Sequence, residues 1–152
     1  MEKIKVVGLN SVRYPAGIFT IIVALVLITP LCGFLFDCGC TWPWTGLDSH
    51  CNSHKPSAVH WCPWCVSTIG GTASVGLAVL IGFLLSVKPS GSGYDMRDFA
   101  WAGIQQKASA LEFIQRTVVG LIGFTFAAAI TAWLSGYLQG YPYFVFIGDW
   151  PL

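Results

Sequence analysis

Cysteine, histidine and tryptophan residues gather in one segment of the chain, residues 38–65, which reads CGCTWPWTGLDSHCNSHKPSAVHWCPWC. This segment contains five of the six cysteines, all three histidines and four of the seven tryptophans. Thiols form disulfides and exchange electrons with other thiols, and they bind soft metal ions together with imidazoles. The segment is therefore where we expect the chemistry of this chain, and three kinds of chemistry fit its residues.

Disulfide formation is the first kind. Cysteines that face an oxidising compartment pair by default, and a short loop buries too little apolar surface to hold itself. A disulfide typically contributes ~2–4 kcal/mol by restricting the unfolded chain. Five loop cysteines cannot all pair among themselves, so either the sixth joins them or one thiol stays unpaired. The candidates are Cys32, Cys38, Cys40, Cys51, Cys62 and Cys65.

Metal binding is the second kind. A Cys-x-Cys followed at a distance by a Cys-x-x-Cys can supply four thiolates, and mixed sets of cysteine and histidine suit zinc or copper. The candidate ligands are Cys38, Cys40, Cys51, His50, His54, His60, Cys62 and Cys65. A covalently attached c-type haem is disfavoured, because valine rather than histidine follows the last of these cysteines.

The tetrapeptide CPWC offers the third kind, thiol–disulfide exchange. It precedes a long apolar run, so Cys62 and Cys65 are expected at the start of a helix, where unpaired N–H groups favour thiolate. In this motif and its placement the chain resembles quinone-linked, disulfide-forming membrane proteins of the DsbB and vitamin K epoxide reductase type. The resemblance implies that Cys62 and Cys65 pass electrons to a quinone, while Cys38, Cys40 or Cys51 exchanges with a substrate thiol.

Three stretches of the chain contain no Asp, Glu, Lys or Arg: residues 14–36, 66–87 and 117–148. The whole chain of 152 residues is 55% hydrophobic and only 10% charged, which is typical of a membrane protein. Each stretch holds an apolar run of about 20 residues or more, enough for a helix to cross the hydrocarbon core. We therefore predict an all-α integral membrane protein, a single membrane domain over residues 1–152, with transmembrane helices near residues 16–36, 66–87 and 117–138.

The basic residues predict the orientation of these helices. Seven of the eight would lie on one side of the membrane, namely Lys3, Lys5, Arg13, Lys88, Arg97, Lys107 and Arg116, and only Lys55 on the other. Because basic residues favour the cytoplasmic side, we expect the N-terminus inside and the C-terminus outside. The loop of residues 37–65 then faces the periplasm or exterior, and the predicted location is the bacterial inner (cytoplasmic) membrane. The basic residues form no stripe that would bind nucleic acid.

Two further segments have a recognisable pattern. In the cytoplasmic loop, residues 88–116, apolar residues recur at helical spacing from Phe99 to Ile114, which predicts a cytoplasmic amphipathic helix leading into the third span. The outer tail, residues 139–152, is rich in aromatic residues. Such a tail is typical of an anchor at the membrane interface, or of a segment that lies in the groove of a partner protein.

Small residues recur every four positions in the second and third spans. They are Gly70, Ser74, Ala78 and Gly82 in one, and Gly123, Ala127, Thr131 and Ser135 in the other. Such faces let helix backbones approach closely. Either the two faces pack on each other, or at least one docks on a helix of another subunit. No ionisable residue lies inside a span, which disfavours a self-contained transporter or pump.

Together these observations favour a non-catalytic role, because the chain also shows no nucleophile–base set of the Ser/His/Asp kind. We expect a small accessory or assembly subunit, embedded in lipid and bound to a larger integral membrane enzyme complex. Its extracytoplasmic loop would be stapled by disulfides or would hold a metal, copper or zinc. The alternative is a quinone-linked thiol–disulfide oxidoreductase that uses Cys62 and Cys65.

Overall fold

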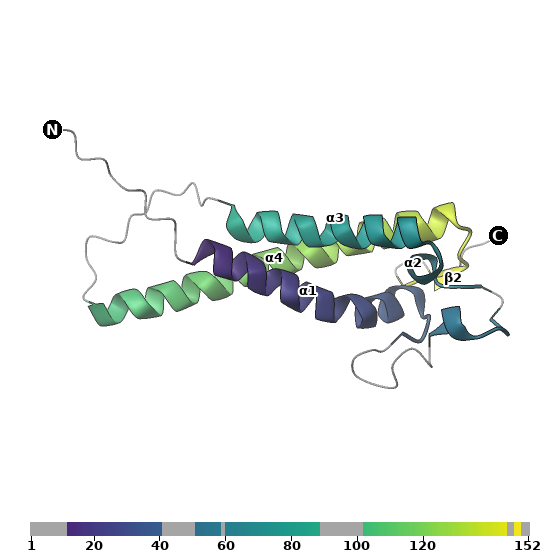
Figure 1. Cartoon of the computed structure of the whole chain (residues 1–152), viewed down its shortest axis with the longest axis horizontal. Coiled ribbons are helices and arrows are strands. Elements are labelled where there is room, and N and C mark those ends of the chain that lie inside the picture. Colours follow the sequence, from purple (N-terminus) through teal and green to yellow (C-terminus); the bar gives the residue numbers. More distant parts are fainter. Residues whose placement is uncertain (1–11, 41–50, 59, 89–101, 146–147, 150–152) are drawn as a thin grey trace.

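The computed structural model describes residues 12–40, 51–58, 60–88, 102–145 and 148–149. Its long helices, α1 (Arg13–Phe36), α3 (Thr68–Val87) and α4 (Ala102–Leu138), lie side by side along the longest axis of the molecule (Figure 1). The short elements are the 3-10 turn η2 (Asn52–His54), helix α2 (Pro63–Val66), and the antiparallel strands β1 (Tyr143–Phe144) and β2 (Gly148–Asp149). They lie at the end of the bundle where α1 ends. We call the described residues within 32–67 and 139–149, which include the end of α1, the cap.

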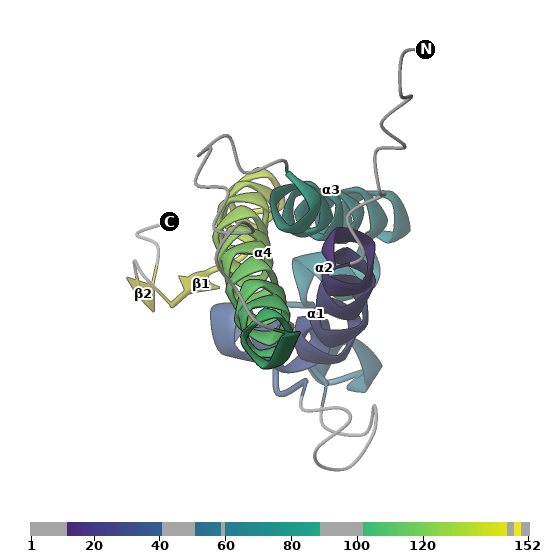
Figure 2. The ribbon, with the colours of Figure 1, turned by 90° about the vertical axis from the view of Figure 1, so that its left-hand side faces the viewer.

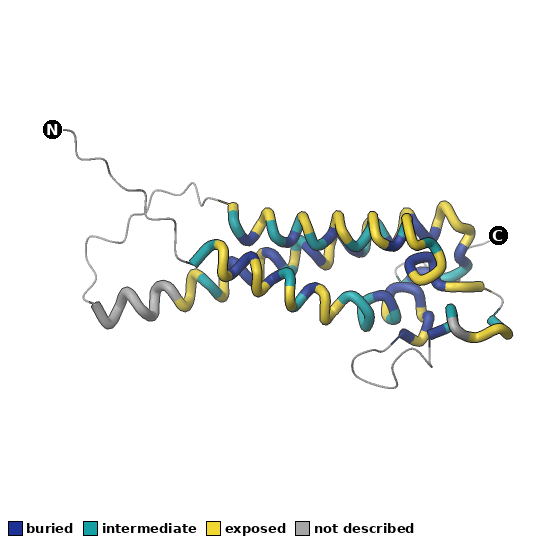
Figure 3. Tube along the Cα trace, in the orientation of Figure 1, coloured by how far each residue is buried: buried dark blue, intermediate teal, exposed yellow. Residues whose placement is uncertain are grey.

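The three long helices form a bundle in which each contacts the other two (Figure 2). Buried residues follow the inner sides of the helices, while exposed residues face outward (Figure 3). Many of the outward residues are large and apolar, such as Ile69, Phe126 and Leu138. Each helix is long and apolar enough to cross a membrane. This confirms the prediction of three long apolar helices; the predicted orientation remains a prediction.

Helix α4 is longer than a bilayer requires. Its 37 residues extend over about 55 Å at 1.5 Å per residue, whereas the hydrocarbon core is about 30 Å thick. We expected a separate amphipathic helix within residues 88–116. The chain is indeed helical from Ala102 onward, but this segment and the third span form one uninterrupted helix, because no proline or glycine occurs between Lys107 and Arg116. Residues 89–101 lie outside the described residues.

Helices α3 and α4 approach each other closely where each carries a glycine. A Cβ atom added to Gly82 of α3 would lie 2.9 Å from the Cβ atom of Phe124 and 3.0 Å from the carbonyl oxygen of Gly120, both on α4. Ala78 and Ala128 are fully buried near this contact. The predicted small-residue face of α3 thus packs on α4 within the chain, but the α4 residues at this contact are Gly120 and Phe124, not those of the predicted α4 face.

Polar groups join the three helices at the end of the bundle far from the cap. The hydroxyl oxygens of Thr20 on α1 and Ser86 on α3 are 2.8 Å apart, within hydrogen-bond distance. Arg116 on α4 is buried, and its Nη1 donates to the carbonyl oxygens of Ser86 (3.2 Å) and Lys88 (3.0 Å) at the end of α3. Its Nε donates to Glu112 at 2.8 Å. Arg116 therefore satisfies carbonyl groups that the end of α3 leaves without partners inside the helix.

Replacing Thr20 by valine removes the inter-helix hydrogen bond with little change in shape. We expect Thr20→Val to lower the free energy of unfolding by about 0.5–1.5 kcal/mol. Thr125→Val is the matched control, because Thr125 is exposed and donates to Leu121 of its own helix at 2.9 Å. Unfolding of the purified variants in mixed detergent micelles measures the difference. Equal losses in the two variants would contradict a role between helices.

Candidate functional site

The aromatic packing of the cap centres on Phe36, the last residue of α1. Its side chain is fully buried, and its ring lies edge-on to the rings of Trp64, Tyr141 and Phe144, with centroids 5.6, 5.5 and 6.2 Å away. Each such pair contributes about 0.5–1.5 kcal/mol beyond the buried area. The end of α1, the turn α2 and the chain after α4 are joined in this way. Tyr141 and Phe144, from the predicted outer tail, are thus buried within the chain's own cap.

Asn52 connects the same segments by hydrogen bonds. Its Oδ1 accepts from the backbone N–H of Cys62 at 3.0 Å, and its own N–H donates to the carbonyl oxygen of Cys38 at 2.9 Å. Its Nδ2 donates to the hydroxyl of Tyr141 at 3.1 Å, which donates to the carbonyl oxygen of Phe36 at 2.9 Å. Burial raises the pKa of Tyr141 to about 12, so this hydroxyl keeps its proton at neutral pH. Asn52 thus holds two cysteine-bearing segments together.

The chain reverses direction directly after α1. Asp37 and Gly39 adopt left-handed backbone conformations, with φ of 48° and 75°. Because glycine has no Cβ atom, Gly39 adopts this conformation without a steric penalty. The turn brings Cys38 and Cys40 close to Cys32, which lies in the last part of α1.

The sulfur atoms of Cys32, Cys38 and Cys62 form one half of a cluster. The Cys32 Sγ atom lies 3.2 Å from that of Cys62 and 3.7 Å from that of Cys38. All three residues are buried, with at most 4% of their surface exposed. They come from the end of α1, the turn after it and the start of α2, so three separate segments deliver them to one place.

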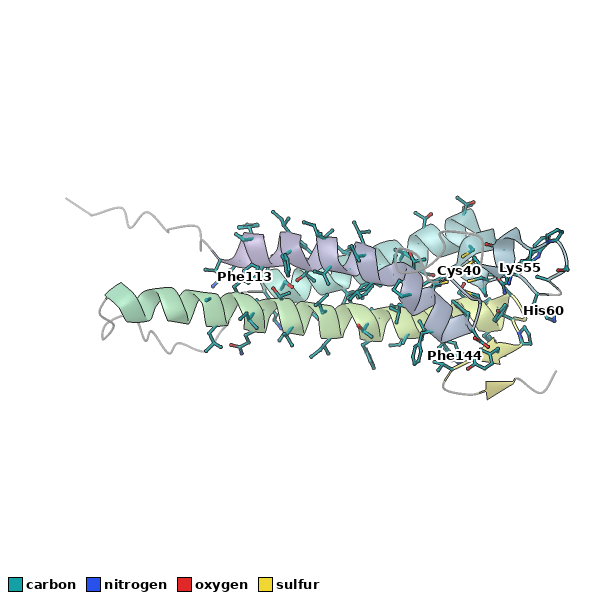
Figure 4. All side chains as sticks on the ribbon, turned by 90° about the horizontal axis from the view of Figure 1, so that it is seen from below. Cys40, Lys55, His60, Phe113 and Phe144 are labelled. Atoms are coloured by element: carbon teal, nitrogen blue, oxygen red, sulfur yellow. A yellow bond between two sulfur atoms is a disulfide. The ribbon has the colours of Figure 1, made fainter. Side chains whose placement is uncertain are left out.

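Cys40, Cys51 and Cys65 form the other half. Cys40 and Cys51 are joined by a disulfide, which Figure 4 shows in the cap near the labelled Cys40. Cys65, the exposed cysteine, places its Sγ atom 3.9 Å from that of Cys40 and 3.8 Å from that of Cys51. One disulfide is therefore present among the six predicted candidates, and Cys32, Cys38, Cys62 and Cys65 are not disulfide-bonded.

Hydrogen bonds between the sulfur atoms shift the thiol pKa values. Those from Cys32 and Cys62 stabilise the thiolate of Cys38 and lower its pKa to about 4, against the opposing effect of burial. At Cys62 the hydrogen bond with Cys32 lowers the pKa, but hydrogen bonds with Cys38 and Cys65, together with burial, outweigh it and raise the pKa overall. Cys38 is therefore the better thiolate of the two.

Cys62 does not lie at the start of the second span, where the sequence analysis expected it. Cys62 precedes the single-turn helix α2, whereas the span itself is α3, which begins at Thr68 with Ser67 as its N-cap. The Ser67 side chain accepts a hydrogen bond from the N–H of Gly70 at 3.0 Å. The CPWC motif is thus separated from the long helix by two residues, Val66 and Ser67, of which the second caps that helix.

Cysteines alone make up the groups of neighbouring ligand atoms in the described part of the chain. Of the predicted histidine ligands, His60 is exposed and belongs to none of these groups. His50 lies outside the described residues, as does the side chain of His54. Sequence reasoning missed Asn52 and Phe36, since a lone amide in a polar loop and a phenylalanine at the end of an apolar run carry no distinguishing pattern.

The cluster is suited to two kinds of chemistry. Four sulfur atoms about 2.3 Å from a tetrahedral zinc ion lie about 3.8 Å from one another. Among the cysteines outside the disulfide, the Sγ atom of Cys32 lies at a similar distance from that of Cys38, 3.7 Å, and closer to that of Cys62, 3.2 Å. A thiolate beside a disulfide can also attack it and form a mixed disulfide. Cys65 stands in that position beside the disulfide of Cys40 and Cys51.

The fold and the cluster together define a three-helix apolar protein with a cysteine centre at one end of its bundle. No family model matches the chain, and no curated protein or solved structure matches it either.

Replacing Tyr141 by phenylalanine tests whether the hydrogen bonds of the cap keep the cysteines buried. The variant loses bonds to Asn52 and Phe36, so we expect a loss of about 1–2 kcal/mol in stability and faster alkylation of the buried thiols. Intact mass after timed alkylation in detergent counts the reacted thiols. Tyr14→Phe, at an exposed position on α1, is the control. Identical alkylation of the two variants would mean that the Tyr141 hydroxyl does not hold the cap closed.

Proposed function

We propose that this chain is a small accessory or assembly subunit of a larger membrane enzyme complex, and that its cap holds one zinc or copper ion through cysteine thiolates. The cap faces the periplasm or exterior of a bacterial inner membrane, as the distribution of basic residues indicates. The observation that carries the metal site is that the four cysteines outside the disulfide gather in the cap from three separate segments.

Those four cysteines approach one another from different segments of the chain, as the ligands of one metal ion must. Cys62 and Cys65 come from one turn of chain, and both lie with Cys32 in a group whose sulfur atoms are within 4.8 Å of one another. Cys38 approaches Cys32 to 3.7 Å from the reversed chain after α1. Four thiolates, here three buried and one exposed, are the ligand set of a structural zinc site, and thiolates also select monovalent copper. The disulfide of Cys40 and Cys51 then staples the intervening loop.

The accessory role is supported by where these ligands lie. The predicted spans, residues 16–36, 66–87 and 117–138, contain no Asp, Glu, Lys, Arg or His, and the sulfur atoms are at the end of the bundle instead of along a path through it. Among them Cys65 is exposed, and Trp61, four positions earlier in the chain, is half exposed. A second protein can therefore reach the metal ligands from the end of the bundle without entering the membrane.

Extraction from native membranes tests the accessory role. In a mild detergent, we expect the tagged chain to be recovered with a larger integral membrane protein at a fixed molar ratio, measured by quantitative mass spectrometry. A mock purification from cells that carry the untagged chain is the control. Recovery of the chain solely as a monomer would refute the accessory role.

A second function, quinone-linked thiol–disulfide exchange, is favoured by one observation: exposed Cys65 lies beside a disulfide. In this reaction a disulfide between Cys62 and Cys65 takes two electrons from the thiols of Cys40 and Cys51, which become the observed disulfide. A quinone then accepts two electrons and two protons from Cys62 and Cys65 and restores their disulfide. Cys32 has no part in this cycle, although it is a ligand in the metal site.

Cys32→Ser therefore distinguishes the two functions. We expect the wild-type protein, purified without a histidine tag or chelators, to contain about one zinc or copper ion per chain, and Cys32→Ser to lose most of it. The double variant Cys40→Ser/Cys51→Ser is the control that keeps all four ligands. Metal content is measured by elemental analysis, and quinone-dependent oxidation of a dithiol peptide by absorbance of the quinone. If the wild-type protein contains no metal and its quinone-dependent oxidase activity survives in Cys32→Ser, the metal site is refuted and the oxidoreductase function is supported.

A further inference from the structure

We propose that reduction of the Cys40–Cys51 disulfide turns the cap into a six-thiolate centre that binds three monovalent copper ions. This inference rests on the proposed function, because it uses the same cap, and it adds a second metal state that depends on the redox state of the cap. The inference is based on the grouping of all six sulfur atoms, whereas the four-ligand site uses only four of them.

The sulfur atoms form three groups of three. In each group, all three atoms lie within 4.8 Å of one another. The groups are Cys32, Cys62 and Cys65; Cys32, Cys38 and Cys40; and Cys40, Cys51 and Cys65. Every cysteine of the chain belongs to at least one group, and Figure 4 shows that the sulfur atoms gather in one part of the cap.

The three groups share their corners. Cys32, Cys40 and Cys65 each belong to two groups, whereas Cys38, Cys51 and Cys62 each belong to one. A thiolate sulfur has enough lone pairs to bridge two metal ions, so the shared cysteines are suited to bridging and the others to terminal ligation. Three metal ions can then each have three sulfur ligands while the chain supplies only six.

Monovalent copper is the ion that fits this arrangement. It is soft, prefers thiolate ligands and is stable with three of them in a trigonal plane. Zinc almost always takes four ligands in a structural site, and each group offers three. Five of the six cysteines are at most 5% exposed, which keeps water from completing the coordination of a fourth position. Cys65, the exposed cysteine, is where copper can first be captured.

Reduction of the disulfide precedes copper binding. An external dithiol reductant attacks the Cys40–Cys51 disulfide, becomes a disulfide itself, and transfers two electrons and two protons to the two cysteines. Six thiolates then bind three monovalent copper ions, each cysteine that was still protonated releases its proton, and copper keeps its oxidation state. With the disulfide closed, two of the three groups lose ligands, since Cys40 belongs to two of them, and the group of Cys32, Cys62 and Cys65 remains intact.

Copper titration of the same protein with and without reduction tests this inference. The full chain in detergent is treated anaerobically with a phosphine reductant, freed of it, and titrated with monovalent copper against a chelating competitor. We expect about three copper ions per chain by elemental analysis and native mass spectrometry, and copper–copper scattering in X-ray absorption. The unreduced protein should bind about one. Because the two samples share one sequence, a difference between them cannot come from a variant that fails to fold.

The double variant Cys40→Ser/Cys51→Ser provides the second comparison. After reduction it should still bind about one ion and show no copper–copper scattering. If reduced wild-type protein also binds one ion, the six-thiolate centre is refuted while the proposed single-metal site stands. If neither protein binds any metal in either state, the proposed metal site and this inference are both refuted.

Discussion

Backbone N–H and C=O groups cannot be left unpaired in hydrocarbon, and this constraint divides the molecule into two parts. Residues 13–36, 68–87 and 102–138 are regular helices, which satisfy their own backbone, and their outward side chains are largely apolar. Turns and left-handed residues, which are needed to bring distant side chains together, are concentrated in the cap. The cysteines accordingly gather at the end of the bundle. Cys32 alone lies within a long helix, so it connects the cluster rigidly to α1.

The packing of the helices determines the geometry of the cap through a few contacts. Close approach at Gly82 and Gly120 sets the distance between α3 and α4. Each of these helices continues into a cap segment, with α2 before α3 and the strands after α4. Phe36 contacts both segments, and the hydrogen bonds of Asn52 join them to the turn that carries Cys38. A shift between helices would therefore move sulfur atoms that now lie within 4 Å of one another.

The sequence predicted the parts of this fold that follow from composition and periodicity. Long uncharged runs indicated the three apolar helices, and regularly spaced small residues indicated which face of α3 packs on α4, because these signals are local. The single helix from Ala102 to Leu138 was missed as a unit, since a change from amphipathic to apolar sequence does not interrupt a helix. The sequence could not predict which cysteines are neighbours. Their proximity depends on the reversal of the chain at Asp37 and on the hydrogen bonds that Asn52 makes to residues far away in the sequence.

The grouping of the sulfur atoms bears on whether the cap needs only disulfides. A disulfide joins two atoms and stabilises most when it closes a long loop, whereas Cys40 and Cys51 are only 11 residues apart. A chain that required staples alone would gain by separating its pairs and closing larger loops. Here all six cysteines lie in overlapping groups of three, and Cys32, Cys40 and Cys65 each belong to two. Pairing makes no use of such sharing, because a sulfur in one disulfide is unavailable to another. Metal ions do use it, since one thiolate can bind two of them, and this difference is the physical argument behind the metal centre that we propose.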